Sequence, residues 1–469
     1  MKITVNNKLC IVGDELELFK IRQYCKENLV LDNPDFYKLE RMGKWTGNTP
    51  KTMRLYEQDS DKLYLPFGCL HDIYELYPDA GLYDLQICPL RPVMYYSNIN
   101  LYPYQEKAVK RALSARNGII VMPCGAGKTQ TALEIIARIG AKTLWLTHTQ
   151  DLLTQSMNRA KAVLGRLQCG TITAGKVNIG NGITFATVQT MAKLDISEYK
   201  NTWDVIVVDE CQHAVGSPTK VMQFYKVVNN LSARYKYGLT ATPKRSDGLE
   251  QSMFALLGGI IHVVSKEAVK DTTCPIKVIP VQTNYMPSDI DVVLAGDGTL
   301  NYASLVDDLI NDGERYELVL SQLRRLIQPT IVLANRVEYL QRLCDDYNRY
   351  QYGNAVCLSG RSQSKAAKAE RKKALQALNN GELDCIFATY QLAKEGLDVP
   401  NLGYVVFATP EKDETTIIQS AGRVGRKADG KEYGVVIDFV DEFAMFRKWY
   451  RQRLKSYKKI EAEVEDYEG

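Results

Sequence analysis

The chain has 469 residues, of which 45% are hydrophobic and 24% are charged, and its formal net charge is +4. This composition is ordinary for a soluble globular protein, and no low-complexity segment or sequence repeat interrupts it. The length suggests about three domains with large hydrophobic cores. The small positive charge permits nucleic-acid binding without requiring it, because local charged patches matter more than the sum.

The cysteines and histidines give no sign of a metal site. Eleven cysteines and four histidines are scattered along the chain without a C-x-x-C pair. We therefore expect no structural zinc, and the free cysteines are typical of a reducing compartment. The first ten residues are polar and strand-like rather than a signal peptide, and no apolar run reaches membrane-spanning length. These features predict a cytoplasmic protein without a membrane partner.

Residues 1–95 lack the regular alternation of strands and helices that follows, and we expect them to form a small α+β accessory domain. Short strand-like runs are separated by turn signals, such as the Asn33-Pro34 pair. Arg41 and Lys44 place basic side chains beside Trp45, with further basic residues up to position 54. The cluster could bind DNA through phosphate pairing and stacking, or Trp45 could be buried in a small core with a solvated basic rim. The sequence favours neither interpretation.

The pattern changes at residue 101. Residues 106–114 are predicted to form a helix, and Gln105 stands directly before it. A glutamine amide is both a donor and an acceptor, so Gln105 could read the edge of an adenine base. The apolar run 118–122 then predicts a short buried strand, and residues 131–136 have the spacing of an amphipathic helix.

Between that strand and that helix stands the sequence Pro123-Cys124-Gly125-Ala126-Gly127-Lys128-Thr129. Glycines allow backbone N–H groups to approach phosphate oxygens at a helix N-terminus. Lys128 would reach the β- and γ-phosphates of a nucleotide, and the Thr129 hydroxyl would bind Mg²⁺. The general pattern has a glycine where this chain has Met122, so the match is not strict. The segment still predicts a nucleotide site.

Further apolar strands are predicted at residues 142–147, 183–187, 204–208 and 235–239, alternating with helices. Near-continuous apolar strands indicate a parallel sheet that is buried on both faces, and active groups of such sheets gather beyond the carboxyl ends of the strands. Polar clusters stand at these ends, including the segments that begin at His148, Asp209 and Thr240. A structural network could explain one such cluster, but it would not explain all of them together with the glycine-rich loop.

The second half of the chain repeats this pattern without a phosphate loop. Residues 271–300 contain several prolines and glycines and are interpreted as a connector. Strands are then predicted at residues 331–334, 355–358, 385–388, 404–407 and 435–438. Two such units, only one of which can grip phosphate, suggest a nucleotide sandwiched between them. The tail from Ala444 is predicted to be one basic and aromatic helix, which could contact nucleic acid or, more commonly, be solvated beside the acidic residues 461–468.

Taken together, residues 100–445 resemble a superfamily 2 helicase or translocase, and within it the DExH-type DNA helicases of the excision-repair and phage branch. The resemblance implies an α/β fold of two tandem RecA-like parallel-sheet domains, at residues 96–270 and 301–445, joined by the connector 271–300. A small N-terminal α+β domain at residues 1–95 would precede them, and a helical tail at 446–469 would follow. Helicases of this branch often carry a small DNA-binding domain ahead of the motor.

The resemblance also assigns roles to matching residues. Gln105 would read adenine, and the loop from Pro123 to Thr129 would bind ATP together with Gly396 and Asp398. Thr129 and Asp209 would hold Mg²⁺. The expected catalytic residues are Lys128, Asp209, Glu210, Gln419, Arg423 and Arg426.

Other matching residues are assigned to movement along the strand. Thr240 and Thr242 would couple hydrolysis to movement, and so would Gln212. The expected nucleic-acid contacts are Thr147, Thr187, Gln189 and Thr389 in the motor, with Arg41, Lys44 and Trp45 in the accessory domain.

One position departs from the branch. The box that begins with Asp209 ends in Gln212, where the related helicases usually have histidine, and His213 follows. Glutamine forms hydrogen bonds but carries no charge, which puts the coupling in question. The resemblance implies an ATP- and Mg²⁺-dependent DNA helicase, with partners among replication, repair or recombination proteins. A duplex translocase that anneals strands and an ATP-gated nucleic-acid clamp are the alternatives, and the sequence does not distinguish DNA from RNA.

Overall fold

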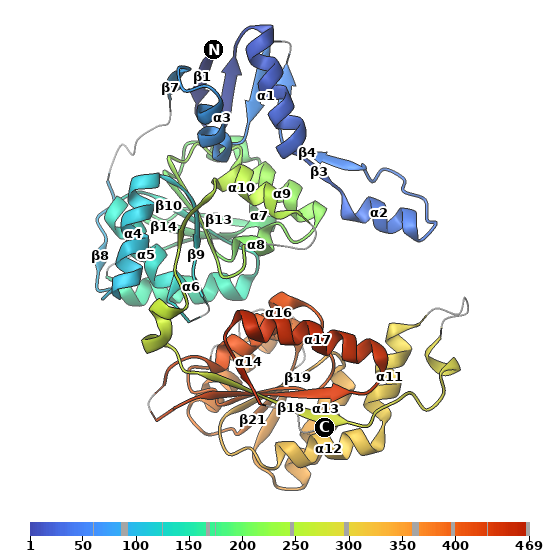
Figure 1. The fold of residues 1–469 in the computed structure, drawn as a ribbon. Coiled ribbons are helices and arrows are strands. Elements are labelled where there is room, and N and C mark those ends of the chain that lie inside the picture. The colour runs from blue at the N-terminus through green and yellow to red at the C-terminus, as the bar shows by residue number, and fades with distance from the viewer. Residues whose placement is uncertain are drawn as a thin grey trace. The chain divides into compact units, whose positions relative to one another are not determined.

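The computed structural model describes residues 1–59, 61–85, 92–123, 125–165, 169–173, 175–243, 248–294, 300–358, 365–394, 399–428 and 430–465. The chain divides into two compact units, Met1–Val269 and Lys270–Gly469, and Figure 1 shows the elements of each. In the described chain, no helix combines the length and the apolar character needed to cross a membrane.

The first unit opens with a small α+β domain, as expected. Its five-stranded sheet has the order β5-β6-β2-β1-β7, in which β1 and β7 are parallel and the other neighbours antiparallel. A capping box between Asp14 and Glu17 begins the first helix. The elements of this domain are β1 (Lys2–Val5), β2 (Leu9–Val12), α1 (Glu15–Asn28), β5 (Glu57–Asp59), β6 (Lys62–Leu65), η1 (Phe67–Cys69), α3 (Leu70–Leu76) and β7 (Gly81–Asp84).

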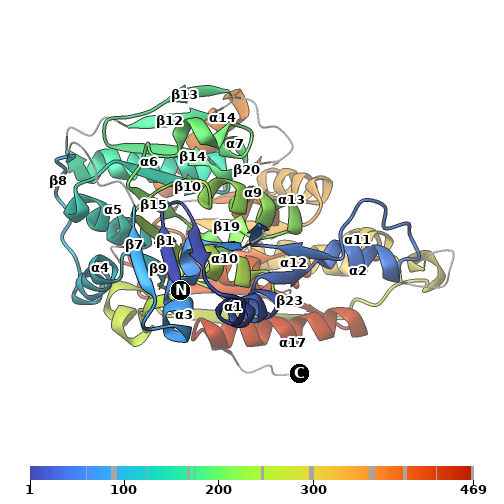
Figure 2. The same cartoon turned by 90° about the horizontal axis from the view of Figure 1, so that it is seen from above.

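An arm formed by residues 30–54 extends from this domain. It consists of β3 (Val30–Asp32), α2 (Pro34–Arg41) and β4 (Thr52–Arg54), and β3 pairs with β4 in an antiparallel ladder. Figures 1 and 2 both show the arm reaching away from the sheet that contains β1 and β7. Leu31 and Met53 at its base are buried in the core of the domain, but α2 has no buried residue.

An eight-stranded sheet fills the rest of the first unit, with the order β13-β12-β14-β10-β15-β16-β9-β17. Its neighbouring strands are parallel except for β12 and β13, which are antiparallel. Side chains of α4, α5 and α6 pack on one face, and those of α7, α9 and α10 pack on the other. Both faces are thus buried, which explains the uninterrupted apolar runs of the strands.

The strands of this part are β8 (Tyr96–Ser97), β9 (Asn117–Val121), β10 (Thr143–Thr147), β11 (Leu164–Gly165), β12 (Gly170–Thr173), β13 (Lys176–Asn178), β14 (Ile183–Thr187), β15 (Val205–Val208), β16 (Tyr235–Thr240) and β17 (Ile260–Val263). The short pair β8 and β11 forms a separate ribbon. The helices are α4 (Pro103–Ala115), α5 (Lys128–Ile139), α6 (Gln150–Val163), α7 (Val188–Met191), η2 (Ile196–Tyr199), α8 (Cys211–Ala214), α9 (Pro218–Val228) and α10 (Glu250–Leu257).

The accessory domain and the eight-stranded sheet share one hydrophobic core, which runs from Ile3 and Leu65 to α9 and α10. Gly68 lies so close to the backbone at the end of α10 that a Cβ atom there would clash with it. Lys236 of β16 is fully buried at this junction. Its Nζ donates to the carbonyl oxygens of Asn7 (3.2 Å) and Val228 (3.1 Å) and lies 5.0 Å from the Phe67 ring centroid. The two parts are therefore packed as one body.

The second unit is built on a seven-stranded parallel sheet with the order β20-β21-β19-β22-β23-β18-β24. Helices α11, α12 and α13 pack on one face and α14, α15 and α16 on the other. The strands are β18 (Ile276–Thr283), β19 (Thr330–Ala334), β20 (Ala355–Leu358), β21 (Cys385–Thr389), β22 (Tyr404–Phe407), β23 (Gly434–Asp441) and β24 (Glu463–Val464). The helices are η3 (Glu267–Thr272), η4 (Asp291–Val293), α11 (Tyr302–Asn311), α12 (Gly313–Leu323), α13 (Val337–Arg349), α14 (Lys365–Asn379), α15 (Tyr390–Lys394), α16 (Glu414–Val424) and α17 (Ala444–Lys459).

The two parallel sheets and the small α+β domain confirm the expected fold class, but the segment 271–300 differs from the connector that we expected. It contains β18, which pairs with β23 over eight residues. The sequence did not predict this strand because Pro280 lies within it. Proline cannot donate a hydrogen bond to a neighbouring strand and therefore argues against a strand assignment. On its other side, within the residues that the structure describes, β18 pairs with β24 at Lys277 and Val278 only. Pro280 thus lies beyond the pairing described for β24, at a position that suits proline, which is tolerated at an edge of a sheet.

The tail from Ala444 forms one helix, α17, as expected, and it is anchored to the second unit by a buried ion pair. Arg453 donates through Nε to Asp438 at 2.8 Å, and the Tyr457 hydroxyl donates to the same carboxylate oxygen at 2.8 Å. Trp449 packs into the same core. The helix is therefore an integral part of this unit rather than a separate tail.

Because Lys236 is buried at the junction in the first unit, it should make the stability of the folded protein depend on pH. Burial lowers the pKa of Lys236 from 10.5 to about 7. Between about pH 7 and about pH 10 the unfolded chain therefore binds a proton that the folded chain lacks, and stability rises with pH across this window. From about pH 7 to about pH 9 we expect the unfolding free energy to increase by about 2 kcal/mol more in the wild type than in Lys236→Met. Urea denaturation at both pH values measures this difference, and equal changes in the two proteins would contradict it.

Candidate functional site

The glycine-rich loop connects β9 to α5, as the sequence predicts. Gly125 and Gly127 have φ values of 82° and 77°, in the left-handed region that favours glycine. A Cβ atom at Gly127 would also clash with the Gln105 amide nitrogen, so space as well as conformation requires glycine there. The first N–H groups of α5 have no partner within the helix, which suits an anion. Cys124 lies outside the described residues.

Gln105 ties this loop to the start of α4. Its side chain is 1% exposed, its Nε2 donates to the Ala126 carbonyl at 2.9 Å, and its Oε1 accepts from the Tyr102 N–H at 2.9 Å. Each end of the amide retains one further hydrogen-bonding position. Recognition of adenine by Gln105 stays a prediction. In the structure, Gln105 connects the phosphate loop to the start of α4 through these two hydrogen bonds.

Two carboxylates follow β15 and face the loop. The Lys128 Nζ lies 3.4 Å from the Glu210 Oε1. Glu210 has φ 47° and ψ 54°, a left-handed conformation that costs a non-glycine residue about 1–3 kcal/mol. Asp209 is buried and accepts a hydrogen bond from the Ser156 hydroxyl at 3.3 Å. Strain of this kind is concentrated at functional sites, where the surrounding structure maintains it.

The two carboxylates have opposite electrostatic environments. Burial raises the pKa of Asp209 to about 7, and the adjacent Glu210 adds to this shift while Lys128 opposes it. For Glu210, burial acts to raise the pKa, but Lys128 and the hydrogen bond from Gln212 hold it below its usual value. Glu210 is therefore ionised at neutral pH. Thr129 and Asp209 offer the oxygen atoms that Mg²⁺ prefers, and a cation would offset the burial of the Asp209 carboxylate.

Gln212 is a partner of Glu210 in this arrangement. Its Nε2 donates to the Glu210 Oε2 at 2.8 Å, and its side chain is almost fully buried. The next residue, His213, packs against His148, with ring centroids 4.4 Å apart. Burial, with a contribution from His213, lowers the pKa of His148 to about 3, so this ring is neutral. The sequence analysis missed the histidine pair, although both residues follow carboxyl ends of predicted strands.

Thr240 ends β16, which lies between the strand before the phosphate loop and the strand before Asp209. Its buried hydroxyl accepts from the Thr242 N–H at 3.0 Å and so fixes the start of the following turn. The segment expected to couple hydrolysis to movement thus stands between the two parts of the nucleotide site.

The expected nucleic-acid contacts differ in exposure. Thr147 and Thr187 are buried, and their hydroxyls bond locally, to the Thr149 carbonyl (2.9 Å) and from the Thr190 N–H (3.2 Å). Their hydroxyls cap local structure, whereas Gln189 and Thr389 are partly exposed. Contact of these four residues with nucleic acid stays a prediction. In the accessory domain, Arg41, Lys44 and Trp45 are all exposed, which contradicts the alternative of a buried Trp45.

In the second unit, Gln419 and Arg423 lie one turn apart on α16, and Arg426 follows the helix. Arg423 donates to the Ala393 carbonyl at 2.5 Å, at the end of α15. Arg426 forms an isolated bridge with Thr273, and its carbonyl accepts from the Lys431 ammonium at 3.1 Å. The adjoining segment with Gly396 and Asp398 lies outside the described residues.

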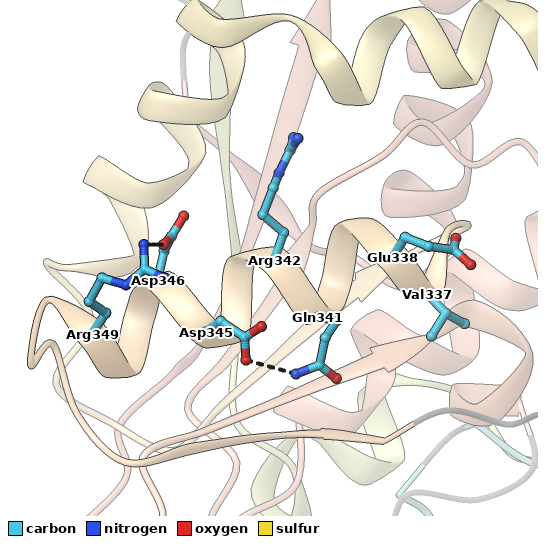
Figure 3. Close-up of a pocket in the computed structure, with 7 residues that line it drawn as sticks. All are labelled: Val337, Glu338, Gln341, Arg342, Asp345, Asp346 and Arg349. Atoms are coloured by element: carbon cyan, nitrogen blue, oxygen red, sulfur yellow. Dashed lines mark hydrogen bonds and ion pairs between the residues drawn. The ribbon is translucent and has the colours of Figure 1, made fainter.

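A hollow of about 640 Å³ along α13 is unrelated to these residues. Figure 3 shows its lining, in which Asp345 accepts from Gln341 at 2.8 Å and Asp346 from Arg349 at 3.0 Å. Because these carboxylates are paired along their own helix, the hollow is a solvated helix face rather than a catalytic site.

Comparison with known proteins agrees with this geometry. The family model of the type III restriction enzyme res subunit matches residues 98–245, and that of the helicase conserved C-terminal domain matches residues 314–428. Together they cover more than half of the chain. The chain belongs to the superfamily 2 helicases. It is therefore a nucleic-acid-dependent enzyme that hydrolyses ATP.

Individual relatives of this helicase differ in the nucleic acid that their names give. "Putative ATP-dependent RNA helicase L396" of Acanthamoeba polyphaga mimivirus is 25% identical over 407 residues, which are 83% of this chain and 73% of that protein. "DNA 3'-5' translocase XPB2" of Sulfurisphaera tokodaii is 28% identical over 360 residues, which are 71% of this chain and 80% of that protein. The structure of S. cerevisiae Dbp5 bound to RNA and ADP BeF3 has a TM-score of 0.57 and 17% identity, and the match covers 85% of this chain and 93% of Dbp5. That likeness supports the RecA-like fold of the helicase.

The lysine and the glutamate of the site should be separable by experiment. Lys128→Ala and Glu210→Gln should both abolish ATP turnover, but only Lys128→Ala should lose ATP affinity, because lysine contacts phosphate directly. Titration with a fluorescent ATP analogue and a turnover assay measure the two properties. Lys26→Ala and Glu27→Gln, on the exposed side of α1, are charge-matched controls. Equal losses of ATP affinity in both site variants would contradict these roles.

Proposed function

We propose that this helicase is an ATP-dependent DNA motor of the DExH type, in which hydrolysis drives translocation and strand separation. The observation that supports the proposal most directly is the arrangement of Lys128, Asp209 and Glu210 beyond β9 and β15, two parallel strands on either side of β16. The likeness to a DNA translocase over most of both chains favours DNA as the substrate. RNA is the second candidate, because another relative is named as an RNA helicase.

The proposed chemistry is phosphoryl transfer to water, in which the protein positions groups and balances charge. Lys128 and the N-terminus of α5 would hold the phosphates. Mg²⁺, bound through Thr129 and Asp209, would supply positive charge beside the phosphate oxygens. Glu210 would orient the attacking water and accept its proton, and its lowered pKa keeps it ionised for this task. Arg423 and Arg426 would stabilise charge on the transferring group, an effect of about 10³–10⁵ in related enzymes.

The contact between Lys128 and Glu210 suggests how substrate prepares the site. At 3.4 Å the two side chains neutralise each other. A γ-phosphate would compete for Lys128 and release Glu210 toward the water, while Gln212 keeps the carboxylate in place through its 2.8 Å hydrogen bond. Glu210 thus becomes available as a base when phosphate is present.

The proposal predicts ATPase activity that depends on DNA. Single-stranded, duplex and forked DNA and RNA should be compared in parallel at equal nucleotide concentration. We expect DNA to raise kcat more than RNA, with an affinity that falls as salt rises because phosphate contacts release counterions. If RNA stimulated the ATPase more strongly than DNA, RNA would be the substrate instead of DNA. An ATPase that is maximal without nucleic acid would remove the motor proposal, and nucleotide-dependent binding without stimulation would favour a clamp.

Gln212 provides a test of coupling. Gln212→Ala should leave ATP binding near the wild-type level, because Lys128 and Thr129 are unchanged, but it should lower the number of base pairs unwound per ATP hydrolysed. Gln212→His should retain much of the activity, since imidazole can replace one hydrogen bond. The measurement combines an unwinding assay with an ATPase assay on the same samples. A slower ATPase with an unchanged ratio would show that Gln212 only positions Glu210.

A further inference from the structure

The arm of residues 30–54 is fixed at its base. Leu31 of β3 and Met53 of β4 are buried in the core of the accessory domain. Asn33 is also buried, and its side chain donates to the Pro50 carbonyl at 2.8 Å and accepts from the Asp35 N–H at 3.1 Å. The two segments that enter and leave the arm, β3 and β4, are thereby held together. The outer part of the arm therefore extends from a fixed base.

The outer part of the arm contributes nothing to the core. Helix α2 has no buried residue, and the loop that follows it presents Trp45, whose side chain is 88% exposed. The other three tryptophans of the chain, Trp145, Trp203 and Trp449, are 0%, 2% and 8% exposed. An indole ring in water forgoes the stabilisation that a core would provide, and large exposed aromatic rings of this kind are typical of binding surfaces.

The Trp45 ring lies close to Gly47. Gly47 has φ 52°, and a Cβ atom there would lie 2.9 Å from the Trp45 ring. One face of the indole therefore packs on the glycine backbone, which only glycine permits. The Lys44 N–H also donates to the Leu39 carbonyl at 3.0 Å and folds the loop back onto α2. The ring thus lies beside the loop backbone while most of its surface is exposed to solvent.

The charge of the arm identifies the partner. Residues 30–54 contain five basic and three acidic residues, a net charge of +2 against +4 for the whole chain. All five basic side chains are exposed: Lys38, Arg41, Lys44, Lys51 and Arg54. None of them forms an ion pair with another residue that the structure describes. An aromatic face among unneutralised cations matches a base attached to phosphates, whereas an acidic peptide would supply charge without a ring to stack.

We propose that the arm binds single-stranded nucleic acid, with an unpaired base stacked on Trp45 and the flanking phosphates against Arg41 and Lys44. The inference rests on the proposed function only in taking nucleic acid as the substrate. Stacking requires an open base, so the arm should prefer single strands or the unpaired arms of a fork to a blunt duplex.

Fluorescence of the full-length protein tests the stacking contact. Because Trp45 is the exposed tryptophan among four, a stacked base should quench its emission, and a thymidine 20-mer is the probe. We expect strong quenching in the wild type, little in Trp45→Phe at nearly unchanged affinity, and an affinity about tenfold weaker in Trp45→Ala. Phe19→Ala, which removes another exposed aromatic ring of the same domain, should behave like the wild type.

Two further ligands separate stacking from charge. Polyglutamate carries charge without bases, and a blunt duplex of equal length carries bases that are already stacked. Equal quenching by either ligand would overturn the stacking proposal. In the double variant Arg41→Gln/Lys44→Gln, the slope of log affinity against log salt should fall by about 1.4, the value for two phosphate contacts to a single strand. An unchanged slope would show that these residues do not contact phosphate.

The same samples distinguish this proposal from the proposed function. If DNA stimulates the ATPase while Trp45 emission stays constant and Trp45→Ala binds like the wild type, only the arm proposal fails. If no nucleic acid binds or stimulates the wild type, the proposed function fails. If the oligonucleotide quenches Trp45 without stimulating the ATPase, the arm proposal stands while the motor proposal falls.

Discussion

Parallel hydrogen bonding between β9, β16 and β15 is the constraint on which the catalytic site depends. Val121 pairs with Thr240, and Val208 pairs with Gly238. Because the strands are parallel and in register, the phosphate loop, the Thr240 turn and the carboxylates all emerge at one edge of the sheet. Lys128 and Glu210, which are 82 positions apart in the sequence, thus have side chains 3.4 Å apart as a consequence of the strand pairing.

One lysine then sets the protonation of this edge. Two adjacent carboxylates repel each other, and burial raises the cost of charging both. Lys128 lies closest to Glu210, so Glu210 retains its charge while Asp209 is left with the raised pKa. The two carboxylates are chemically almost the same, so their positions relative to Lys128 account for the difference in pKa. This difference suits Glu210 to the proposed role of base and Asp209 to that of cation ligand.

Most of the fold could be predicted from the sequence, because a parallel strand that is buried on both faces is apolar along its whole length. All ten strands predicted from apolar runs are present, and β18 escaped notice because Pro280 breaks that pattern. The sequence predicted which residues belong to the site, but it did not predict their conformations or their contacts with one another. The left-handed conformation of Glu210 and the packing of Gln105 behind the loop depend on tertiary contacts that have no local signature. Exposure of Trp45 could not be predicted either, since the same residues would suit a small core.

The position of Lys236 makes β16 a direct connection between the accessory domain and the catalytic edge. One end of this strand is bonded to Asn7 of the accessory domain, and the other ends in the Thr240 turn beside the phosphate loop. Because both contacts lie on one strand in the middle of the sheet, the accessory domain and the catalytic edge are joined through hydrogen-bonded structure rather than through a linker.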